Sequence, residues 1–173
     1  MRFFDKLFGS KKPAKPEAVA AKAERGVVCA AVGGRVEVTA DIPDPMFAGE
    51  MMGRTVAVWP EAGEVFAPIS GTLTAAMPHA FGIAGDDGVE VLIHVGVDTV
   101  SMNGEGFTVW AEKGARVAAG DPIVSFDKAK VKAAGHPDIV MTIVTNSDDY
   151  PQLQVIVETE STVSAGDQAI RTA

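Results

Sequence analysis

The segment Val89–Val97 constrains the fold more than any other part of the sequence. It reads VEVLIHVGV, so five apolar residues alternate with Glu90, Leu92, His94 and Gly96. Side chains of an extended strand point alternately to its two faces, and we expect the five apolar ones to face a core. His94 is then predicted to lie on the opposite, outward face of a firmly anchored strand, held rigidly yet reachable.

The chain from Val27 onward has the same all-β character. Short β-branched runs occur at 36–39, 55–59, 89–97, 139–144 and 153–157, separated by Gly, Pro, Asp and Asn. Short helical turns are expected only at 129–135 and 147–153. Two patterns occur twice: V-x-A-x-x-x-G-x-[VL] from residues 28 and 65, and V-x-x-G-D from residues 117 and 163. We therefore predict an all-β fold, an antiparallel β-sandwich of the duplicated barrel-sandwich type.

Length and composition exclude several classes of protein. The 173 residues, 47% of them hydrophobic, match one domain of roughly 100 to 200 residues. No apolar run reaches the roughly 18 to 20 residues that cross a bilayer, and no signal peptide is evident, so a cytoplasmic protein is expected. The single cysteine, Cys29, excludes an internal disulfide. The net charge of −8 opposes binding to nucleic acid.

The charge is divided unevenly along the chain. Residues 1–25 hold seven cations against three carboxylates, a net +4, whereas the remainder holds eight against twenty, a net −12. We predict a mobile basic tail at 1–26 and a folded domain at 27–173. The first eight residues, MRFFDKLF, place apolar side chains at helical spacing. Two interpretations stay open: simple disorder, or a short amphipathic helix that makes weak contact with anionic lipid at the inner face of the membrane.

Two of the three histidines are candidates for a shared site. His79 follows Pro78 and is expected in a turn. If residues 79–84 pair with 89–94 through a turn at Asp87-Gly88, the rings of His79 and His94 approach each other. Because histidine titrates near neutral pH, such a pair suits proton relay, metal binding or phosphoryl transfer. The alternative interpretation is that both histidines are ordinary surface residues. His136 is predicted to lie in a surface loop.

Asp98 falls on the same face as His94. Four residues of extended strand span roughly 13 Å, so no contact is expected unless the chain bends near Gly96.

The segment from Gly88 to Phe107 resembles a known family. Its pattern Gly88-x-x-Val91-Leu-Ile-His94-Val-Gly-Val-Asp98-Thr-Val100 is similar to the phosphorylation-site signature of the glucose-family enzyme IIA component of the bacterial phosphoenolpyruvate-dependent sugar phosphotransferase system. Further matching segments, in the same order, are Pro43–Phe47, Ala67–Gly71, His79–Phe81 and Gly120-Asp121. The resemblance covers residues 27–170 and implies a compact β-sandwich that carries phosphate.

The resemblance also implies roles for individual residues. His94 matches the phosphorylated nucleophile and His79 its phosphoryl-orienting companion, while Gly96 and Thr99 match supporting positions. Four further residues match the partner-binding rim: Asp44, Phe47, Leu92 and Asp98. The implied donor is the histidine-containing phosphocarrier protein, and the implied acceptor is a cysteine of an enzyme IIB domain of a sugar permease. No cofactor is required.

This sequence departs from the family pattern beside both histidines. Enteric members carry aromatic residues where Ala75 and Leu92 stand, so the apolar collar around the site is expected to be shallower. Met77 replaces a residue that is often a hydroxyl donor to the companion histidine. Another group must then fix that ring.

Three alternatives remain at this point. The domain could act mainly as a regulator whose phosphorylation state controls transporters or metabolic enzymes. A biotinyl or lipoyl carrier would need a lysine at the turn occupied by Met77-Pro-His79. For a zinc hydrolase, His79 and His94 leave the metal one protein ligand short, unless Asp98 or a carboxylate of a partner protein completes a shared site at the interface.

Overall fold

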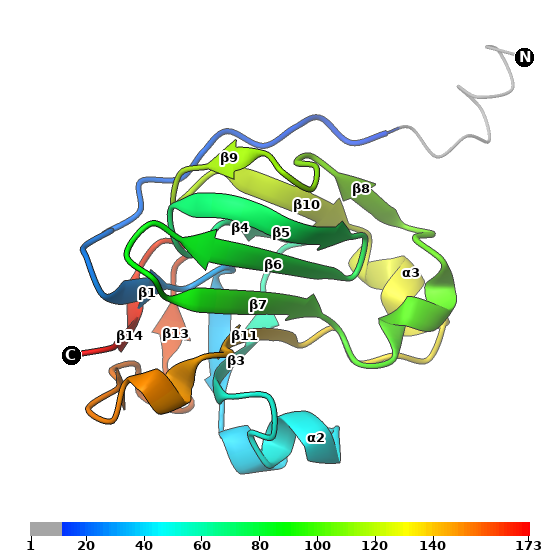
Figure 1. Cartoon of the computed structure of the whole chain (residues 1–173). Helices are drawn as coiled ribbons and strands as arrows, with labels where there is room; N and C mark the ends of the chain where they lie inside the picture. Colours follow the sequence, from blue (N-terminus) through cyan, green and yellow to red (C-terminus); the bar gives the residue numbers. More distant parts are fainter. Residues whose placement is uncertain (1–11) are drawn as a thin grey trace, which may run out of the picture.

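The computed structural model describes residues 12–173, and their strands pair antiparallel in three sheets (Figure 1). One sheet has the strand order β13-β2-β3-β11-β7-β6-β5-β9, and two smaller sheets have the orders β1-β14-β12 and β4-β10-β8. The strands are β1 (Val27–Cys29), β2 (Gly34–Glu37), β3 (Arg54–Pro60), β4 (Glu64–Phe66), β5 (Gly71–Met77), β6 (Ala80–Gly85), β7 (Glu90–Val95), β8 (Phe107–Val109), β9 (Arg116–Val117), β10 (Pro122–Phe126), β11 (Val140–Val144), β12 (Gln154–Val155), β13 (Thr162–Val163) and β14 (Gln168–Arg171). The predicted fold class is confirmed.

Helical segments are short. Among residues 12–173, the α-helices are α2 (Pro45–Ala48) and α3 (Lys128–Ala133), and the 3₁₀ turns are η1 (Thr39–Asp41), η2 (Thr99–Met102) and η3 (Ser147–Asp149). Both predicted helical turns are present, as α3 and η3. No helix among residues 12–173 has the length and apolar character needed to span a bilayer.

The alternation predicted for Val89–Val97 is confirmed as far as Val95, whereas Val97 lies beyond the bend at Gly96 and packs in a second apolar cluster with Leu92. Val91, Ile93 and Val95 of β7 are buried in the main core, and β7 pairs with β6 on one side and β11 on the other. The opposite face of β7 is less open than predicted. Every residue of β11 is buried, and Met141 and Ile143 join this second apolar cluster, which lies beneath α2 and includes Phe47. His94 is therefore half-buried rather than freely exposed.

The predicted duplication is visible in the backbone hydrogen bonds. In one half, the Ala30 N–H donates to Asp167 O (2.7 Å) and the Gly166 N–H donates to Ala30 O (2.9 Å). The same two bonds join Ala67 to Asp121 and Gly120 in the other half, each at 2.8 Å. The aspartate carboxylates also match, because each accepts from the backbone N–H three residues earlier at 2.9 Å. The repeated V-x-x-G-D pattern therefore marks equivalent turns.

The described part of the amino-terminal segment lies against the domain. The Val19 N–H donates to Gly120 O (3.0 Å) and the Lys22 N–H donates to Gly166 O (2.9 Å). The boundary between residues 26 and 27 stays a prediction. The proposed helix MRFFDKLF lies outside the described residues.

Candidate functional site

The chain turns sharply directly after His94. Gly96 has φ +78°, a left-handed conformation that favours glycine, and Asp98 has φ +60°. Two backbone bonds hold the bend, from Gly96 N to Ile139 O (2.8 Å) and from Val97 N to Pro137 O (3.0 Å). The buried Thr99 hydroxyl donates to Val95 O. The strand end that carries His94 is thus fixed from both sides.

The bend also fixes the tautomer of His94. Its Nδ1 lies 2.7 Å from the carbonyl oxygen of Gly96. A carbonyl oxygen only accepts hydrogen bonds, so Nδ1 must carry the proton. In the neutral ring, Nε2 then keeps its lone pair and is free to act as a nucleophile.

His79 lies beside His94, as predicted. It occupies the turn between β5 and β6, and its carbonyl oxygen accepts from the Val95 N–H at 2.8 Å. Ala80 stands opposite His94 in the β6–β7 register. The two ring centroids are 5.4 Å apart, and the ring planes are nearly perpendicular at 77°. The pairing of β6 with β7 therefore produces the two-histidine site.

Phe47 differs from its expected place at the rim. Asp44 caps α2 by accepting from the N–H groups of Met46 (2.8 Å) and Phe47 (3.4 Å). This cap aims Phe47 inward, where it is 3% exposed and its ring centroid lies 4.9 Å from that of His94. Phe47 supports the imidazole from below, and almost none of its surface is available to a partner. Leu92 is half-buried and packs against the same apolar cluster.

Burial lowers the pKa of both imidazoles. For His94, desolvation has the largest effect; the Gly96 acceptor raises the pKa, His79 lowers it, and the charges of Asp44 and Asp98 raise it. For His79, burial alone lowers the pKa. Burial therefore favours the neutral form of both rings, which is the state a nucleophilic nitrogen needs.

Asp98 and His136 have secondary positions. The bend at Gly96 brings Asp98 close enough to act on His94 electrostatically, so the expectation of an extended 13 Å separation does not apply here. His136 was expected at the surface; it is half-buried, and its Nε2 lies 3.0 Å from Ser101 Oγ. Neither residue completes a dyad with His94.

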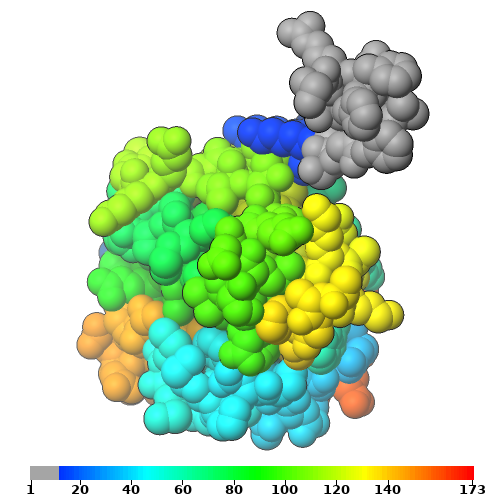
Figure 2. All heavy atoms as spheres, turned by 90° about the vertical axis from the view of Figure 1, so that its right-hand side faces the viewer, coloured from blue at the N-terminus to red at the C-terminus, as the bar shows by residue number. Residues whose placement is uncertain are grey.

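Three exposed apolar side chains come from the elements that hold the histidine pair. Met46 belongs to α2, Met77 precedes the His79 turn and Val100 belongs to η2, and they are 41%, 49% and 60% exposed. Figure 2 looks onto this side, with the chain around residue 100 near the centre and the segment of α2 below it. We call the surface formed by Met46, Met77 and Val100 around the two histidines the docking face. Met46 and Val100 lie within the matching segments Pro43–Phe47 and Gly88–Phe107, but the sequence analysis assigned neither of them a role.

A metal site is not evident within the described chain. Among residues 12–173, no group of three or more histidine, cysteine, aspartate or glutamate side chains is arranged to hold a metal ion. The His79–His94 pair supplies two nitrogen ligands, fewer than the three protein ligands of a typical catalytic zinc.

Comparison with known proteins gives one consistent family. Residues 26–150 match the family model described as phosphoenolpyruvate-dependent sugar phosphotransferase system, EIIA 1. The chain is 39% identical to the glucose-specific EIIA component of Halalkalibacterium halodurans, over 98% of this chain and 96% of that protein. It is 41% identical to the beta-glucoside-specific EIIBCA component of Bacillus subtilis over 82% of this chain, but spans only 23% of that longer protein. The solved glucose permease IIA from Mycoplasma capricolum is similar in fold, with a TM-score of 0.74 and 31% identity over 85% of this chain and 95% of that one.

Proposed function

This chain belongs to the EIIA 1 family of the phosphoenolpyruvate-dependent sugar phosphotransferase system, and on that premise we propose that His94 is the residue on which it carries a phosphoryl group. Components of this family are phosphotransferases that pass phosphoryl groups between proteins through a phosphohistidine. The observation that carries the assignment of His94 is its bond to Gly96, which leaves Nε2 as the free nitrogen.

The transfer we propose is an in-line displacement at phosphorus. The lone pair of His94 Nε2 forms the new N–P bond while the N–P bond of the donor phosphohistidine breaks. A donor ring protonated on its other nitrogen leaves as neutral imidazole, and His94 keeps its Nδ1 proton. The phosphorylated His94 ring is then cationic. The Gly96 carbonyl and the nearby charges of Asp44 and Asp98 stabilise that cation, as they do the protonated ring.

We propose that His79 orients the phosphoryl group. Its ring lies edge-on to that of His94, with 5.4 Å between the centroids, and we expect one of its nitrogens to donate to an oxygen of the phosphoryl group on Nε2. The turn that carries His79 is held by the bond from Val95 N to His79 O. Met77 offers no hydroxyl to fix this ring, and the bound phosphoryl group supplies the missing partner.

The donor and acceptor proteins would use the docking face. We propose that the histidine-containing phosphocarrier protein delivers the phosphoryl group there, and that the cysteine of an enzyme IIB domain removes it. An apolar centre with Asp44 and Asp98 beside it suits a partner that is apolar at its centre and basic at its rim. The EIIBCA relative supports the IIB assignment, because its name joins the two components in one protein. Both proposed partners are expected in the cytoplasm.

A zinc ion is proposed only at a shared interface. His79 and His94 would provide two nitrogen ligands, and a partner protein would have to supply a carboxylate to complete the site. Tight stoichiometric zinc in the isolated protein would contradict this.

The test is reconstitution with phosphoenolpyruvate, enzyme I and the histidine-containing phosphocarrier protein, with acid-labile phosphate mapped by mass spectrometry. We expect one phosphoryl group on His94 in the wild type and none in His94→Ala. His136→Ala is the matched control and should be labelled normally. His79→Gln should slow transfer onward to an enzyme IIB domain. Label that persists in His94→Ala would refute the assignment.

A further inference from the structure

The two V-x-x-G-D turns bind the described amino-terminal segment of the same chain. Gly120 and Gly166 have left-handed φ values of +95° and +91°, and the carbonyl oxygen of each accepts a backbone hydrogen bond from that segment. The acceptor at Gly120 receives the Val19 N–H, and the acceptor at Gly166 receives the Lys22 N–H. Three residues of extended chain span about 10 Å, so the segment bridges both halves of the duplicated fold.

The glycines also make room for this segment. A Cβ added to Gly120 would lie 2.2 Å from Val19 O, and one added to Gly166 would lie 2.8 Å from Ala20 O. Neither turn would accept the segment at this distance with a larger residue. Val19 and Ala21 are half-buried, whereas Ala18, Ala20 and Lys22 are exposed, an alternation typical of a strand on a surface.

Side-chain contacts reinforce the backbone bonds at the Gly166 end. Gln168 Nε2 donates to Lys22 O at 2.9 Å, and the Lys22 ammonium lies 3.1 Å from the Asp167 carboxylate. The ion pair is exposed and adds little, so the backbone and amide bonds dominate.

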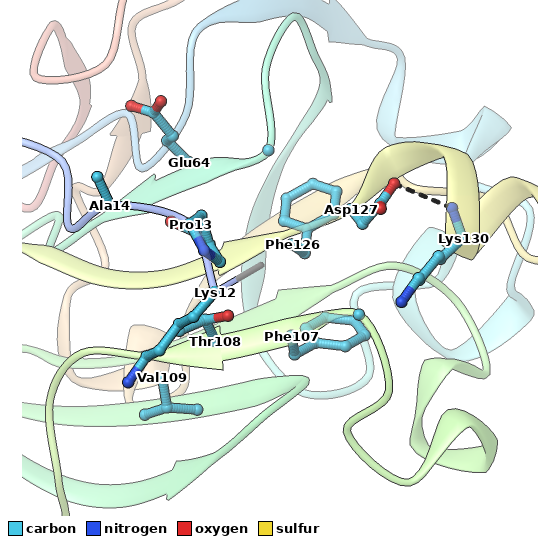
Figure 3. Close-up of a pocket in the computed structure, with 13 residues that line it drawn as sticks. Lys12, Pro13, Ala14, Glu64, Phe107, Thr108, Val109, Phe126, Asp127 and Lys130 are labelled. Carbon is cyan, nitrogen blue, oxygen red and sulfur yellow. Dashed lines mark hydrogen bonds between the residues drawn. The ribbon is translucent and has the colours of Figure 1, made fainter. Parts of the chain in front are cut away.

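From Val19 the chain continues to the far side of the molecule. In Figure 1 the segment runs from β1 over the sandwich to the side where β7 ends and α3 lies. There Lys12 lies 5.3 Å from the centre of the Trp110 ring, and residues 12–14 line a hollow of about 730 Å³ beside Phe107, Phe126 and Lys130 (Figure 3). Lys130 also lines a second hollow, which lies beside η2, the 3₁₀ turn that follows the His94 strand.

We propose that Val19–Lys22 is a clasp that docks across the two V-x-x-G-D turns and thereby holds residues 12–18 over the side of the molecule where β7 ends and α3 lies. Without the clasp, the amino-terminal segment would leave the domain at Gly26, beside β1 and away from the docking face. Lys12 then lies beside Trp110, and Lys12, Pro13 and Ala14 share a hollow with Lys130.

The experiment locates residue 14 in solution with a nitroxide label. Cys29 is fully buried, so Ala14→Cys provides the single accessible thiol. In the labelled chain we expect broadened amide signals for Gly106–Val109 and Lys130, which line the same hollow as Ala14. Unbroadened signals there would overturn the proposal at once.

Proline substitutions then test the clasp itself. Val19→Pro with Lys22→Pro removes both donors, because proline has no N–H. The control variant, Ala18→Pro with Ala23→Pro, also carries two added prolines, but at exposed positions that make neither of these two hydrogen bonds. We expect the broadening to disappear in the first pair and to persist in the second, with the amide signals of β7 and β11 unchanged in both. Persistence in the first pair, or equal loss in both, would refute the clasp. If the first pair fails to fold, Lys22→Pro alone, which removes one of the two donors, is compared with Ala23→Pro alone in the same way. No phosphorylation is involved, so the result is independent of the role proposed for His94.

Discussion

Replacing Gly96 by alanine should destabilise the protein and slow phosphorylation of His94 together. Gly96 has φ +78°, and a Cβ there would lie 2.4 Å from Thr99 Cγ2 and 3.0 Å from Pro137 O. Thr99 is 1% exposed and its hydroxyl bonds Val95 O, so its side chain cannot rotate away without breaking that bond. The backbone must move instead, and it carries the carbonyl that orients His94.

Gly135 supplies a matched control. Its φ is +83°, nearly that of Gly96, but an added Cβ would meet nothing within 4 Å. Alanine at either position incurs the left-handed penalty of roughly 1 to 2 kcal/mol. Only at Gly96 does overpacking add a further cost of about 1 to 3 kcal/mol. We therefore expect losses of about 1 to 2 kcal/mol for Gly135→Ala and about 2 to 5 kcal/mol for Gly96→Ala.

Urea unfolding followed by circular dichroism measures both losses, and the initial rate of phosphorylation by the phosphocarrier protein gives the second readout. Gly96→Ala should be slower than the wild type, since a displaced carbonyl no longer holds the proton on Nδ1, while Gly135→Ala should react at the normal rate. If the unfolding free energies of the two variants agree within about 0.5 kcal/mol, or if their rates agree, the reasoning about the bend is wrong.

Three further changes test other parts of the site. Burial lowers the pKa of His79 and His94 below the ordinary 6.5, so the unfolded chain binds protons at a higher pH than the folded protein does. The unfolding free energy should therefore fall as the pH drops from about 6.5 through the pKa values of the folded protein. Imidazole NMR titrations of the folded protein with both midpoints at or above 6.5 would contradict this. Phe47→Ala removes a ring that is 3% exposed and should cost about 3 to 5 kcal/mol in urea unfolding, and a loss under about 1 kcal/mol would show that the ring does not support His94. Met77 is 49% exposed, so Met77→Glu should leave the unfolding free energy within about 0.5 kcal/mol of the wild type but raise the KM for the phosphocarrier protein. The control Ile156→Glu, next to β12, should change neither quantity. Equal KM values for the two variants would show that Met77 is not part of the docking face.

The central hairpin was predictable because its sequence leaves few options. The alternation in Val89–Val97 fixes which side chains face the core, and the turn at Asp87-Gly88 fixes the partner strand. Together they allow His79 to approach His94 if the two strands pair, and the β6–β7 register confirms that pairing. The two equivalent turns were also predictable from the sequence, because both require a glycine with a left-handed backbone conformation.

The position of Phe47 was not predictable from local pattern. It follows from the direction in which α2 approaches β11, and that direction depends on the Asp44 cap and on apolar residues almost a hundred positions away, such as Met141. The docking of Val19 and Lys22 was missed for a similar reason. A segment rich in alanine, lysine and proline has no apolar periodicity, and its bonds are made by backbone groups whose partners lie at Gly120 and Gly166.

The depth of His94 explains how one imidazole is both reactive and accessible. Deeper burial would lower its pKa further but would prevent another protein from reaching Nε2, whereas full exposure would leave part of the population protonated near neutral pH. Phe47 limits the depth from below, at 4.9 Å between ring centroids. The bond from Nδ1 to the Gly96 carbonyl sets which nitrogen reacts, and it also raises the pKa of His94, so it opposes the larger effect of burial.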